Sequence, residues 1–368
     1  VGGANLKAAL LDGNGELQQV LQVPCALWRG LSELEAAIDM VLKELAFKPA
    51  MHAVTMTGEL VDLFANRQIG VRSISQVMDE KLTGSKWFYT GRFDVDASPA
   101  GVSGFVALDA VDQHWRHIAS ANWLASASYT GLQLQRLQKY QHGLLIDIGS
   151  TTSDFVLLEN NQPACLAYTD ASRMQTEELI YTGVVRTPLM AVAQKIRFEN
   201  SITSVAAEYF ATTADVYRLT GDLLAANDIV DTADGQEKTP VASARRIARM
   251  IGHDVEDAAM PMWLALAQEF KLQQLIRLKE AAVSHISRIK TSNQTSKIVI
   301  VGAGVGCFLA REIAALMNMQ YIDIAELIEK PSGNTSEVLP DTLMDIAHWA
   351  GVCLPAGAVA KLLHNNLN

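Results

Sequence analysis

Hydrophobic and polar residues recur with two different periods along the chain, and each period predicts a different kind of element. Largely apolar runs over residues 143–147 and 297–301 predict buried strands, and a glycine-rich turn follows each run. Apolar residues spaced by three and four positions over residues 32–47, 241–251 and 261–290 predict helices. Alternation of such strands and helices is typical of an α/β protein.

One pattern of turn and strand occurs twice. The segment from Val1 to Lys7 aligns with the segment from Ile148 to Asp154, and each leads from a β-branched residue and a glycine through small residues into a strand. The second copy follows a strand that ends at Asp147, so the repeat predicts a strand and an acidic residue before Val1 as well. A repeat of this length indicates two related domains.

Small residues at such a turn are typical of phosphate binding. Glycine lets the backbone approach an anion, and consecutive N–H groups form a concave nest to which hydroxyl groups add neutral donors. We expect Asp147 and Asp154 to hold Mg²⁺ or its water shell, because this cation binds few carboxylates together with substrate phosphates. The alternative is a pair of ordinary hairpins. The expected phosphate-binding residues are Gly2, Gly3, Asn5 and Lys7 in the first copy and Gly149, Ser150, Thr151 and Thr152 in the second.

A third glycine cluster follows the apolar run over residues 297–301. Gly302, Gly304 and Gly306 lead into a helix that begins near Cys307, and a helix N-terminus suits a phosphate or a nucleotide. The cluster lacks the glycine spacing of a dinucleotide-binding fingerprint.

Several charged residues are further candidates for the site. Glu59 follows a predicted strand over residues 52–57, and ligands of open α/β sheets lie at the carboxyl ends of strands. The alternative for Glu59 is a helical first turn whose acid complements the helix dipole. Arginine matches phosphate oxygens bidentately, although most exposed arginines only solvate a helix face. The arginine candidates for a diphosphate clamp are Arg173, Arg186, Arg245 and Arg246.

Composition narrows the class of protein. The chain has 368 residues, 49% hydrophobic and 19% charged, which is enough for two domains. Its net charge of −10 argues against a nucleic-acid partner. Four scattered cysteines without a Cys-x-x-Cys pair argue against disulfides or structural zinc. Without a bilayer-length apolar run or a signal peptide, we expect a cytoplasmic protein with no membrane partner, in which an oligomer is possible.

The three glycine clusters together resemble the superfamily of actin, sugar and acetate kinases and heat-shock chaperone ATPases. In that superfamily two phosphate hairpins and an adenosine loop occur in this order. Residues 147–154 are similar to the phosphate loop of the hydantoinase A/oxoprolinase branch, which reads Asp-x-Gly-Gly/Thr-Thr-Thr-x-Asp. The resemblance implies an α/β fold of two actin-like, ribonuclease H-like domains that flank a cleft. We expect residues 1–142 with 341–368 in one domain, and 143–340 with a helical insert at about 201–290 in the other.

Four segments are similar to members of this branch from tetrahydromethanopterin-linked one-carbon metabolism. They are Val1–Lys7, Thr57–Leu60, Tyr181–Leu189 and Phe210–Tyr217. In methanogens these members serve methanofuran biosynthesis, joining an aminomethylfuran diphosphate to γ-glutamyltyramine through an ether bond with release of pyrophosphate. The resemblance implies a transferase in which Mg²⁺ on Asp147 and Asp154 neutralises the leaving pyrophosphate. Glu59 or His348 would take the phenol proton.

Two other classes of function stay open. The first is an ATP-dependent phosphotransferase or a hydantoinase/oxoprolinase-like amidohydrolase, with ATP contacting both phosphate loops and the turn at Gly302–Gly306. The second is a nucleotide-dependent structural or sensor protein. ATP binding itself is uncertain, since Phe308 either fills the space where relatives hold adenosine or is the buried face of the next helix.

Two segments of the second half carry turn-rich sequence. Asp228–Pro240 is polar and predicts a flexible loop. Asp341–Leu363 predicts two short helices broken at Pro355–Gly357, the second of which is expected to pack on the first domain.

Overall fold

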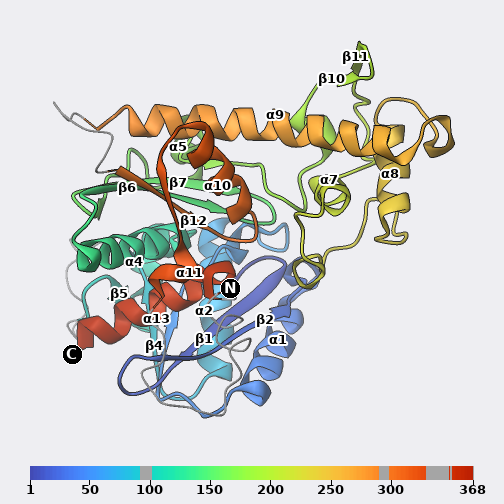
Figure 1. The fold of residues 1–368 in the computed structure, drawn as a ribbon. Helices are drawn as coiled ribbons and strands as arrows, with labels where there is room; N and C mark the ends of the chain where they lie inside the picture. The colour runs from blue at the N-terminus through green and yellow to red at the C-terminus, as the bar shows by residue number, and fades with distance from the viewer. Residues whose placement is uncertain (92–101, 290–297, 329–347, 349, 368) are drawn as a thin grey trace, which may run out of the picture. The chain divides into compact units, whose positions relative to one another are not determined.

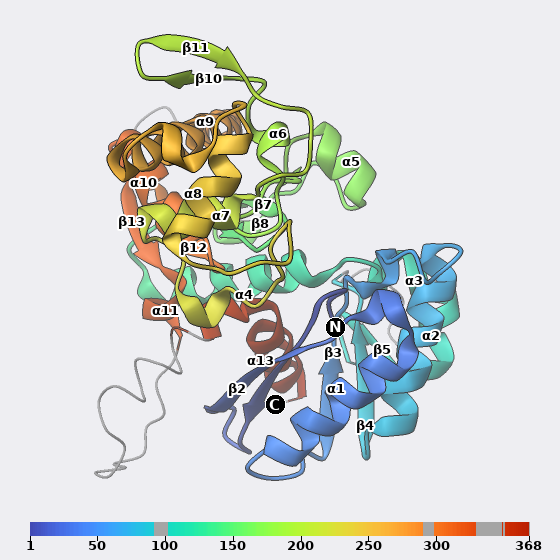
Figure 2. The same cartoon turned by 90° about the vertical axis from the view of Figure 1, so that its right-hand side faces the viewer.

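The computed structural model describes residues 1–91, 102–289, 298–328, 348 and 350–367. The chain divides into two compact units, drawn from two directions in Figure 1 and Figure 2. Unit 1 contains Val1–Lys139, Asn161–Pro163 and Ile324–Asn368, and unit 2 contains Tyr140–Asn160 and Ala164–Asp323.

Unit 1 contains a hairpin, a parallel strand pair and a set of helices. Strands β1 and β2 pair antiparallel, β3 and β4 pair parallel with α2 between them in the sequence, and β5 joins β4 antiparallel. Its elements are β1 (Asn5–Leu11), β2 (Leu17–Pro24), η1 (Leu27–Arg29), α1 (Leu31–Glu44), β3 (Met51–Val54), η2 (Gly58–Leu60), α2 (Arg67–Lys81), β4 (Ser85–Tyr89), β5 (Phe105–Val106), η3 (Leu108–Ala110), α3 (Val111–Ile118), α4 (Asn122–Leu137), β8 (Gln162–Pro163), α11 (Ile324–Leu327) and α13 (Leu354–Leu367).

An apolar core holds the helices of unit 1 against its strands. Ile38 of α1, Ile74 of α2 and Phe88 of β4 belong to one buried cluster. Burying each such side chain stabilises the fold by about 1.5–3 kcal/mol. The N-terminus of α2 is fixed by Asn66, whose side chain accepts a hydrogen bond from Ile69 N at 3.0 Å.

The C-terminal segment of unit 1 differs from the sequence-based prediction. Helix α13 packs against α4 and β1, and it runs from Leu354 to Leu367 without a break at Pro355–Gly357. The predicted break between two helices is present but lies at Cys353, two residues before Pro355, because residues 350–352 are helical, Cys353 forms a turn and α13 begins at Leu354. Pro355 lies in the first turn of α13, where a missing N–H removes no intrahelical hydrogen bond.

Unit 2 is built on a mixed sheet. The strand order is β13-β12-β6-β7, with β9 also paired to β7; β6 is parallel to β12 and antiparallel to β7. The elements are β6 (His142–Ile148), β7 (Ser153–Glu159), α5 (Asp170–Gln175), β9 (Leu179–Ile180), α6 (Leu189–Val192), β10 (Lys195–Phe198), β11 (Ser201–Ser204), α7 (Thr213–Thr220), η4 (Ala225–Asn227), α8 (Pro240–Arg249), η5 (Val255–Asp257), α9 (Met260–Ile286), β12 (Ile298–Ala303), α10 (Cys307–Leu316) and β13 (Gln320–Asp323).

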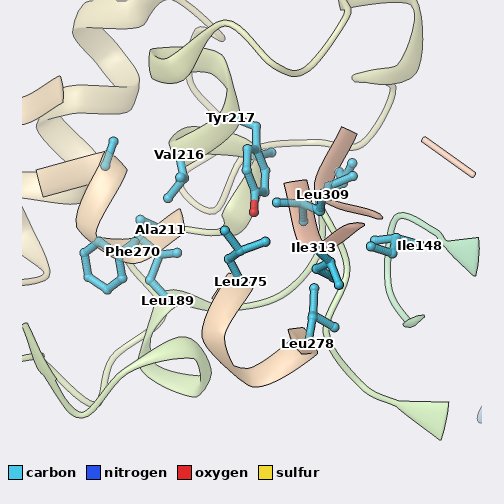
Figure 3. Close-up of a cluster of buried hydrophobic side chains, with 14 of the residues drawn as sticks. Ile148, Leu189, Ala211, Val216, Tyr217, Phe270, Leu275, Leu278, Leu309 and Ile313 are labelled. Carbon is cyan, nitrogen blue, oxygen red and sulfur yellow. The ribbon is translucent and has the colours of Figure 1, made fainter. Parts of the chain in front are cut away.

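A second apolar core joins the sheet of unit 2 to its helices. Figure 3 shows Ile148, at the end of β6, in the same cluster as Ile313 of α10 and Leu278 of α9. Helices α7, α8 and α9 pack on one another within the region expected to be a helical insert. The core therefore extends from the end of β6 to the long helix α9.

The predicted α/β class is confirmed by the mixed strands and helices of both units. The predicted helices over residues 32–47, 241–251 and 261–290 correspond to α1, α8 and α9. The predicted strands over residues 143–147 and 297–301 correspond to β6 and β12. Within the described residues, no helix has both the length and the apolar character needed to cross a bilayer.

Candidate phosphate-binding site

The turn between β6 and β7 is closed by one backbone hydrogen bond. Gly149 N donates to Thr152 O at 2.8 Å, which brings Ser150 and Thr151 to the tip. The hydroxyl groups of these two residues lie 3.4 Å apart, and all four turn residues are half-buried. The turn is thus ordered while its tip stays open to solvent.

The first two carbonyl groups of this turn, those of Gly149 and Ser150, are held by a single neighbouring segment. Val184 N donates to Gly149 O at 3.1 Å, and the next two N–H groups, of Val185 and Arg186, both donate to Ser150 O at 3.1 and 2.9 Å. Across the described part of the chain, the N–H groups of residues 150–152 have no protein acceptor. Gly149 O and Ser150 O are thus paired within the protein, while the N–H groups at the tip are available to a ligand or to water.

Gly183 explains how the supporting segment approaches the turn so closely. A Cβ atom on Gly183 would lie 2.5 Å from Ser150 C and from Thr151 N, a distance that no side chain tolerates. Any larger residue at this position would displace the backbone of the turn, because backbone atoms cannot move aside as a flexible side chain can. The glycine is therefore required by close packing.

The two predicted metal ligands lie opposite each other at the ends of the hairpin strands. Asp147 and Asp154 are paired in the β6–β7 register, so their side chains share one face of the sheet. Asp154 accepts a hydrogen bond from Arg173 Nη1 at 2.8 Å, and Arg173 is 1% exposed. Burial raises the pKa of Asp154, and the Arg173 guanidinium opposes that increase.

These carboxylates fit a magnesium ion that brings its own phosphate ligands. Among the described residues, no group of three or more His, Cys, Asp or Glu side chains could hold a metal. Asp147 and Asp154 therefore supply at most two ligands, and Mg²⁺ commonly completes its shell with phosphate oxygens and water. Arg173 already occupies one oxygen of Asp154.

The third glycine turn lies directly against the turn of residues 149–152, called the phosphate turn from here on. Gly304 has φ +78°, and a Cβ there would lie 2.5 Å from Asp147 Oδ1 and 2.4 Å from Ile148 O. Gly306 N donates to the same Ile148 carbonyl at 2.8 Å. Gly302, in contrast, lies within β12 and is covered by the Tyr321 side chain, so packing explains that glycine.

Phe308 forms part of the packing of α10. Its ring contacts the edge of Tyr217 at 5.1 Å between centroids, and Lys271 Nζ lies 5.3 Å from its centroid. Lys271 in turn forms ion pairs with Asp222 at 2.8 Å and Glu312 at 2.7 Å. The ring is half-buried, and it packs against the core of unit 2.

The first glycine turn, in unit 1, is closed in the same way. Gly2 N donates to Asn5 O at 2.9 Å, while a Cβ on Gly3 would lie 2.9 Å from a methyl group of Val61. The ammonium group of Lys7 donates one hydrogen bond within unit 1, to Val352 O at 2.8 Å.

Glu59 lies in the short helix η2, five residues after the end of β3 at Val54. It is 1% exposed, and its carboxylate accepts a hydrogen bond from Ser120 Oγ at 2.7 Å. Gly70 of α2 covers it closely, since a Cβ there would lie 2.7 Å from Glu59 O. Glu59 thus occupies a helical first turn after a strand, which combines both sequence-based interpretations.

The four candidate arginines separate into two groups. Arg173 and Arg246 are buried in ion pairs, and Arg246 contacts Asp215 at 2.8 Å and Asp234 at 3.0 Å. Arg245 and Arg186 are exposed, and Arg186 belongs to the segment of residues 184–186 whose N–H groups contact the turn of residues 149–152. Arg186 is therefore the arginine best placed for a ligand of this turn.

The same ion pairs hold the segment predicted to be a flexible loop. Asp228 accepts two hydrogen bonds from Arg218, at 2.5 and 2.8 Å, and Asp234 contacts Arg246 at its other end. The polar sequence of this loop supplies partners for buried arginines rather than a freely solvated connection.

Sequence reasoning did not identify the polar residues that hold Gly183. These residues are Thr182, Thr187, Thr213 and Gln274. The motif Thr182-Gly183 was visible in one of the segments that resemble the one-carbon family, but it carried no assigned role. Gln274 gave no signal beyond being a polar residue on an otherwise apolar helix face.

Two α/β units, each with a glycine turn, and a third glycine turn after a strand define an actin-like ATPase fold. The hydantoinase/oxoprolinase family model matches residues 51–330, and the chain belongs to this family. The resemblance to that branch of the superfamily is thereby confirmed.

Curated relatives come from two methanogens. The chain is 26% identical over 372 residues to (4-{4-[2-(gamma-L-glutamylamino)ethyl]phenoxymethyl}furan-2-yl)methanamine synthase of Methanocaldococcus jannaschii, covering 100% of this chain and 97% of the relative. It is 27% identical over 225 residues to the enzyme of the same name from Methanococcus vannielii, covering 61% and 92% of the two chains. Among solved structures, a PilM–PilN type IV pilus biogenesis complex aligns with TM-score 0.45 and 12% identity, over 98% of this chain and 97% of that chain.

Proposed function

We propose that this chain is a transferase of methanofuran-type cofactor biosynthesis. It binds an aminomethylfuran diphosphate at the turn of residues 149–152 and joins the furanylmethyl carbon to the phenol of tyramine or γ-glutamyltyramine. The observation that carries the phosphate part is the turn itself, with its first two carbonyls held by residues 184–186 and its N–H groups left for a ligand. The names of the two methanogen relatives support the choice of substrates.

The proposed reaction replaces one carbon–oxygen bond by another. The bond from the furanylmethyl carbon to the diphosphate breaks, and both of its electrons leave with pyrophosphate. The phenol oxygen forms the new ether bond and loses its proton to a base. Glu59 is the candidate for that base, as a buried carboxylate next to the first glycine turn.

In this proposal, the residues around the turn stabilise the negative charge of the leaving pyrophosphate. N–H and hydroxyl groups of Ser150, Thr151 and Thr152 donate to the phosphate oxygens as negative charge grows on them. Asp147 would hold Mg²⁺, which when bound neutralises phosphate charge. The exposed guanidinium of Arg186 extends this donor set, because its own backbone is fixed to the turn at Ser150 O.

A second candidate function is ATP-dependent phosphotransfer or amide hydrolysis. The position of Gly304 and Gly306 against Ile148 favours it, since a nucleotide could then contact two glycine turns of unit 2 at once. In this case a substrate oxygen would attack the γ-phosphorus in line, and ADP would form.

Product analysis separates the two functions. Purified protein with Mg²⁺, the furan diphosphate and γ-glutamyltyramine should release pyrophosphate and form the ether without any nucleotide. A requirement for ATP, or ADP as the phosphate-containing product, would overturn the transferase and support the second candidate. The Asp147→Asn variant, expected to be folded and nearly inactive, controls for contaminating phosphatases.

A further inference from the structure

A buried set of polar side chains lies behind the segment that supports the phosphate turn. Gly183 O accepts hydrogen bonds from Gln274 Nε2 at 3.0 Å and from Thr213 Oγ1 at 2.9 Å. Gly183 N donates to Thr187 Oγ1 at 2.8 Å. Side chains from α9, from α7 and from Thr187 in the same segment therefore fix Gly183, where an added Cβ would lie 2.5 Å from Ser150 C and Thr151 N.

Gln274 is the centre of this set. Its Nε2 group donates to Thr182 Oγ1 at 2.8 Å as well as to Gly183 O, and its Oε1 accepts from the hydroxyl of Tyr217. A primary amide has two N–H donors and a carbonyl acceptor, and all three functions are used here. Ser153 completes the arrangement by donating to Thr182 O at 2.6 Å.

These hydrogen bonds are important for stability because Gln274 is buried. It is 3% exposed, and it lies on the face of α9 that also buries Phe270 and Leu278. A buried amide without hydrogen-bond partners destabilises a fold, and Gln274 avoids this cost because all its partners are in place. Figure 3 shows Tyr217 and Leu275, the residue after Gln274, within the same cluster.

We propose that Gln274 is a positioning residue for the phosphate turn. It fixes the carbonyl of Gly183, the N–H groups of the next three residues then hold the first two carbonyls of the turn, and the N–H groups of residues 150–152 face the ligand. This inference rests on the proposed diphosphate site. A residue with only a structural role would change the stability of the fold without changing the affinity of the folded protein for phosphate.

The decisive variant is Gln274→Glu, because it keeps the size of the side chain and an acceptor for Tyr217. The carboxylate loses both donors and places negative charge against the Gly183 carbonyl. We expect the Kd for Mg²⁺-pyrophosphate, measured by calorimetry at pH 7.5, to rise about tenfold. Gln268→Glu makes the same change of charge at an exposed position of α9 and should leave this Kd unchanged.

A pH series adds a second readout. Protonation of the new carboxyl restores one donor, so the ratio of the Kd of Gln274→Glu to that of the original chain should shrink as the pH falls. Thr213→Val removes a different donor to Gly183 O with little change in size and covers the case in which Gln274→Glu fails to fold. It should weaken Mg²⁺-pyrophosphate binding in the same direction.

The outcomes separate this inference from the proposed function. If the unaltered chain does not bind Mg²⁺-pyrophosphate, the diphosphate site is wrong and the positioning role falls with it. If the unaltered chain binds and the folded Gln274→Glu and Thr213→Val variants bind equally well, the site stands and the positioning role is overturned. Weaker binding by the folded variants, with Gln268→Glu unchanged, supports it.

Discussion

The glycine turns of the two units have the same backbone hydrogen-bond pattern but different side chains. Gly2 and Gly149 make the same hydrogen bond, to the carbonyl three residues ahead, at 2.9 and 2.8 Å. In each unit the residue before that glycine also accepts a bond from the turn that follows a parallel strand. Val1 O accepts from Thr57 N at 2.8 Å, and Ile148 O accepts from Gly306 N at 2.8 Å. The internal repeat therefore includes a second turn as well as the hairpin.

Side chains distinguish the two copies. The turn of unit 2 carries three hydroxyl groups and has Asp147 beside it, whereas positions 3 and 4 of unit 1 are glycine and alanine. The charged groups near the first turn have partners within unit 1, since Lys7 contacts Val352 and Glu59 contacts Ser120. The two turns therefore have the same hydrogen-bond pattern, and the hydroxyl groups and the acidic residue expected to bind a phosphate and its metal are found in the turn of unit 2.

The largest difference between the units should appear when Asp147 is changed. Asp147→Asn removes the charge that would hold Mg²⁺ next to the phosphate turn, while the amide keeps the size of the side chain. We expect turnover to fall by about 100–1,000-fold, the usual effect of losing a group that stabilises transition-state charge. Pyrophosphate release at saturating and at limiting Mg²⁺ measures it.

Asp39→Asn provides the matched control. It removes an exposed carboxylate of unit 1 that pairs with Lys81 at 2.6 Å, an interaction worth about 0–1 kcal/mol. Turnover of this variant should stay unchanged. Near-normal activity of Asp147→Asn at limiting Mg²⁺ would show that the metal role of Asp147 is wrong.

Substitution of Glu59 tests whether this residue of unit 1 takes part in the proton transfer or has only a structural role. If Glu59 takes the phenol proton, Glu59→Gln should lower kcat by about 100-fold, within the range for general bases. The affinity for Mg²⁺-pyrophosphate should not change, because the phosphate donors belong to unit 2. Ser120→Ala removes the hydrogen bond to Glu59 but leaves the carboxylate, so its effect on kcat should be much smaller. Equal losses in kcat and in thermal stability for both variants would indicate a structural Glu59.

Alanine variants of Gly183 and Gly58 test how tightly each unit is packed around its glycine turn. A methyl group at Gly183 meets the backbone of Ser150 and Thr151 at 2.5 Å, whereas at Gly58 it meets a terminal methyl of Leu27 at 2.7 Å. Because Leu27 can rotate and backbone cannot, Gly183→Ala should cost about 1–3 kcal/mol and Gly58→Ala less. Calorimetric unfolding measures both free energies. Equal costs would contradict the claim that the second turn depends on close backbone packing.

The elements that sequence could predict are those whose signals are contiguous. Strands β6 and β12 are largely apolar, and the glycine turns follow them directly, so the sequence shows both as local patterns. The site residues around Asp147 and Gly149 could be named for the same reason. Their assigned roles as phosphate and metal ligands stay predictions.

The features that could not be predicted depend on contacts between distant segments. Gln274 and Gly183 are 91 positions apart in the sequence, and no periodic pattern predicts a hydrogen bond between them. The ion pairs of Arg218 and Arg246 hold Asp228 and Asp234 although the sequence there is typical of a loop. The break expected at Pro355–Gly357 lies at Cys353 instead, because proline is tolerated in the first turn of a helix and α13 therefore begins before it, at Leu354.

The smallest expected effect is on the stability of the fold at acidic pH, and it comes from a histidine buried in unit 2. His285, near the end of α9, is 1% exposed, stacks on Phe155 with centroids 6.0 Å apart, and has Nε2 3.0 Å from Glu177 O. Burial lowers its pKa below the usual 6.5, although the Glu177 carbonyl opposes the shift. The unfolded chain therefore binds this proton more readily than the folded chain does. Stability from the neutral ring is complete above about pH 6.5 and is lost as the pH falls through the lowered folded-state pKa.

His285→Gln replaces the ring by a neutral amide that does not titrate in this range. Between pH 7.5 and 5.0, the unaltered chain should lose about 2 °C more in Tm than the variant, roughly the effect of 1 kcal/mol or less in a domain of this size. Scanning calorimetry at several pH values measures the difference, and comparing the two chains removes the contribution of other titrating groups. Parallel curves for the two chains would mean that His285 is protonated as easily in the folded state as in the unfolded state. Burial of the α9 terminus against β7 would then contribute nothing to the acid sensitivity of unit 2.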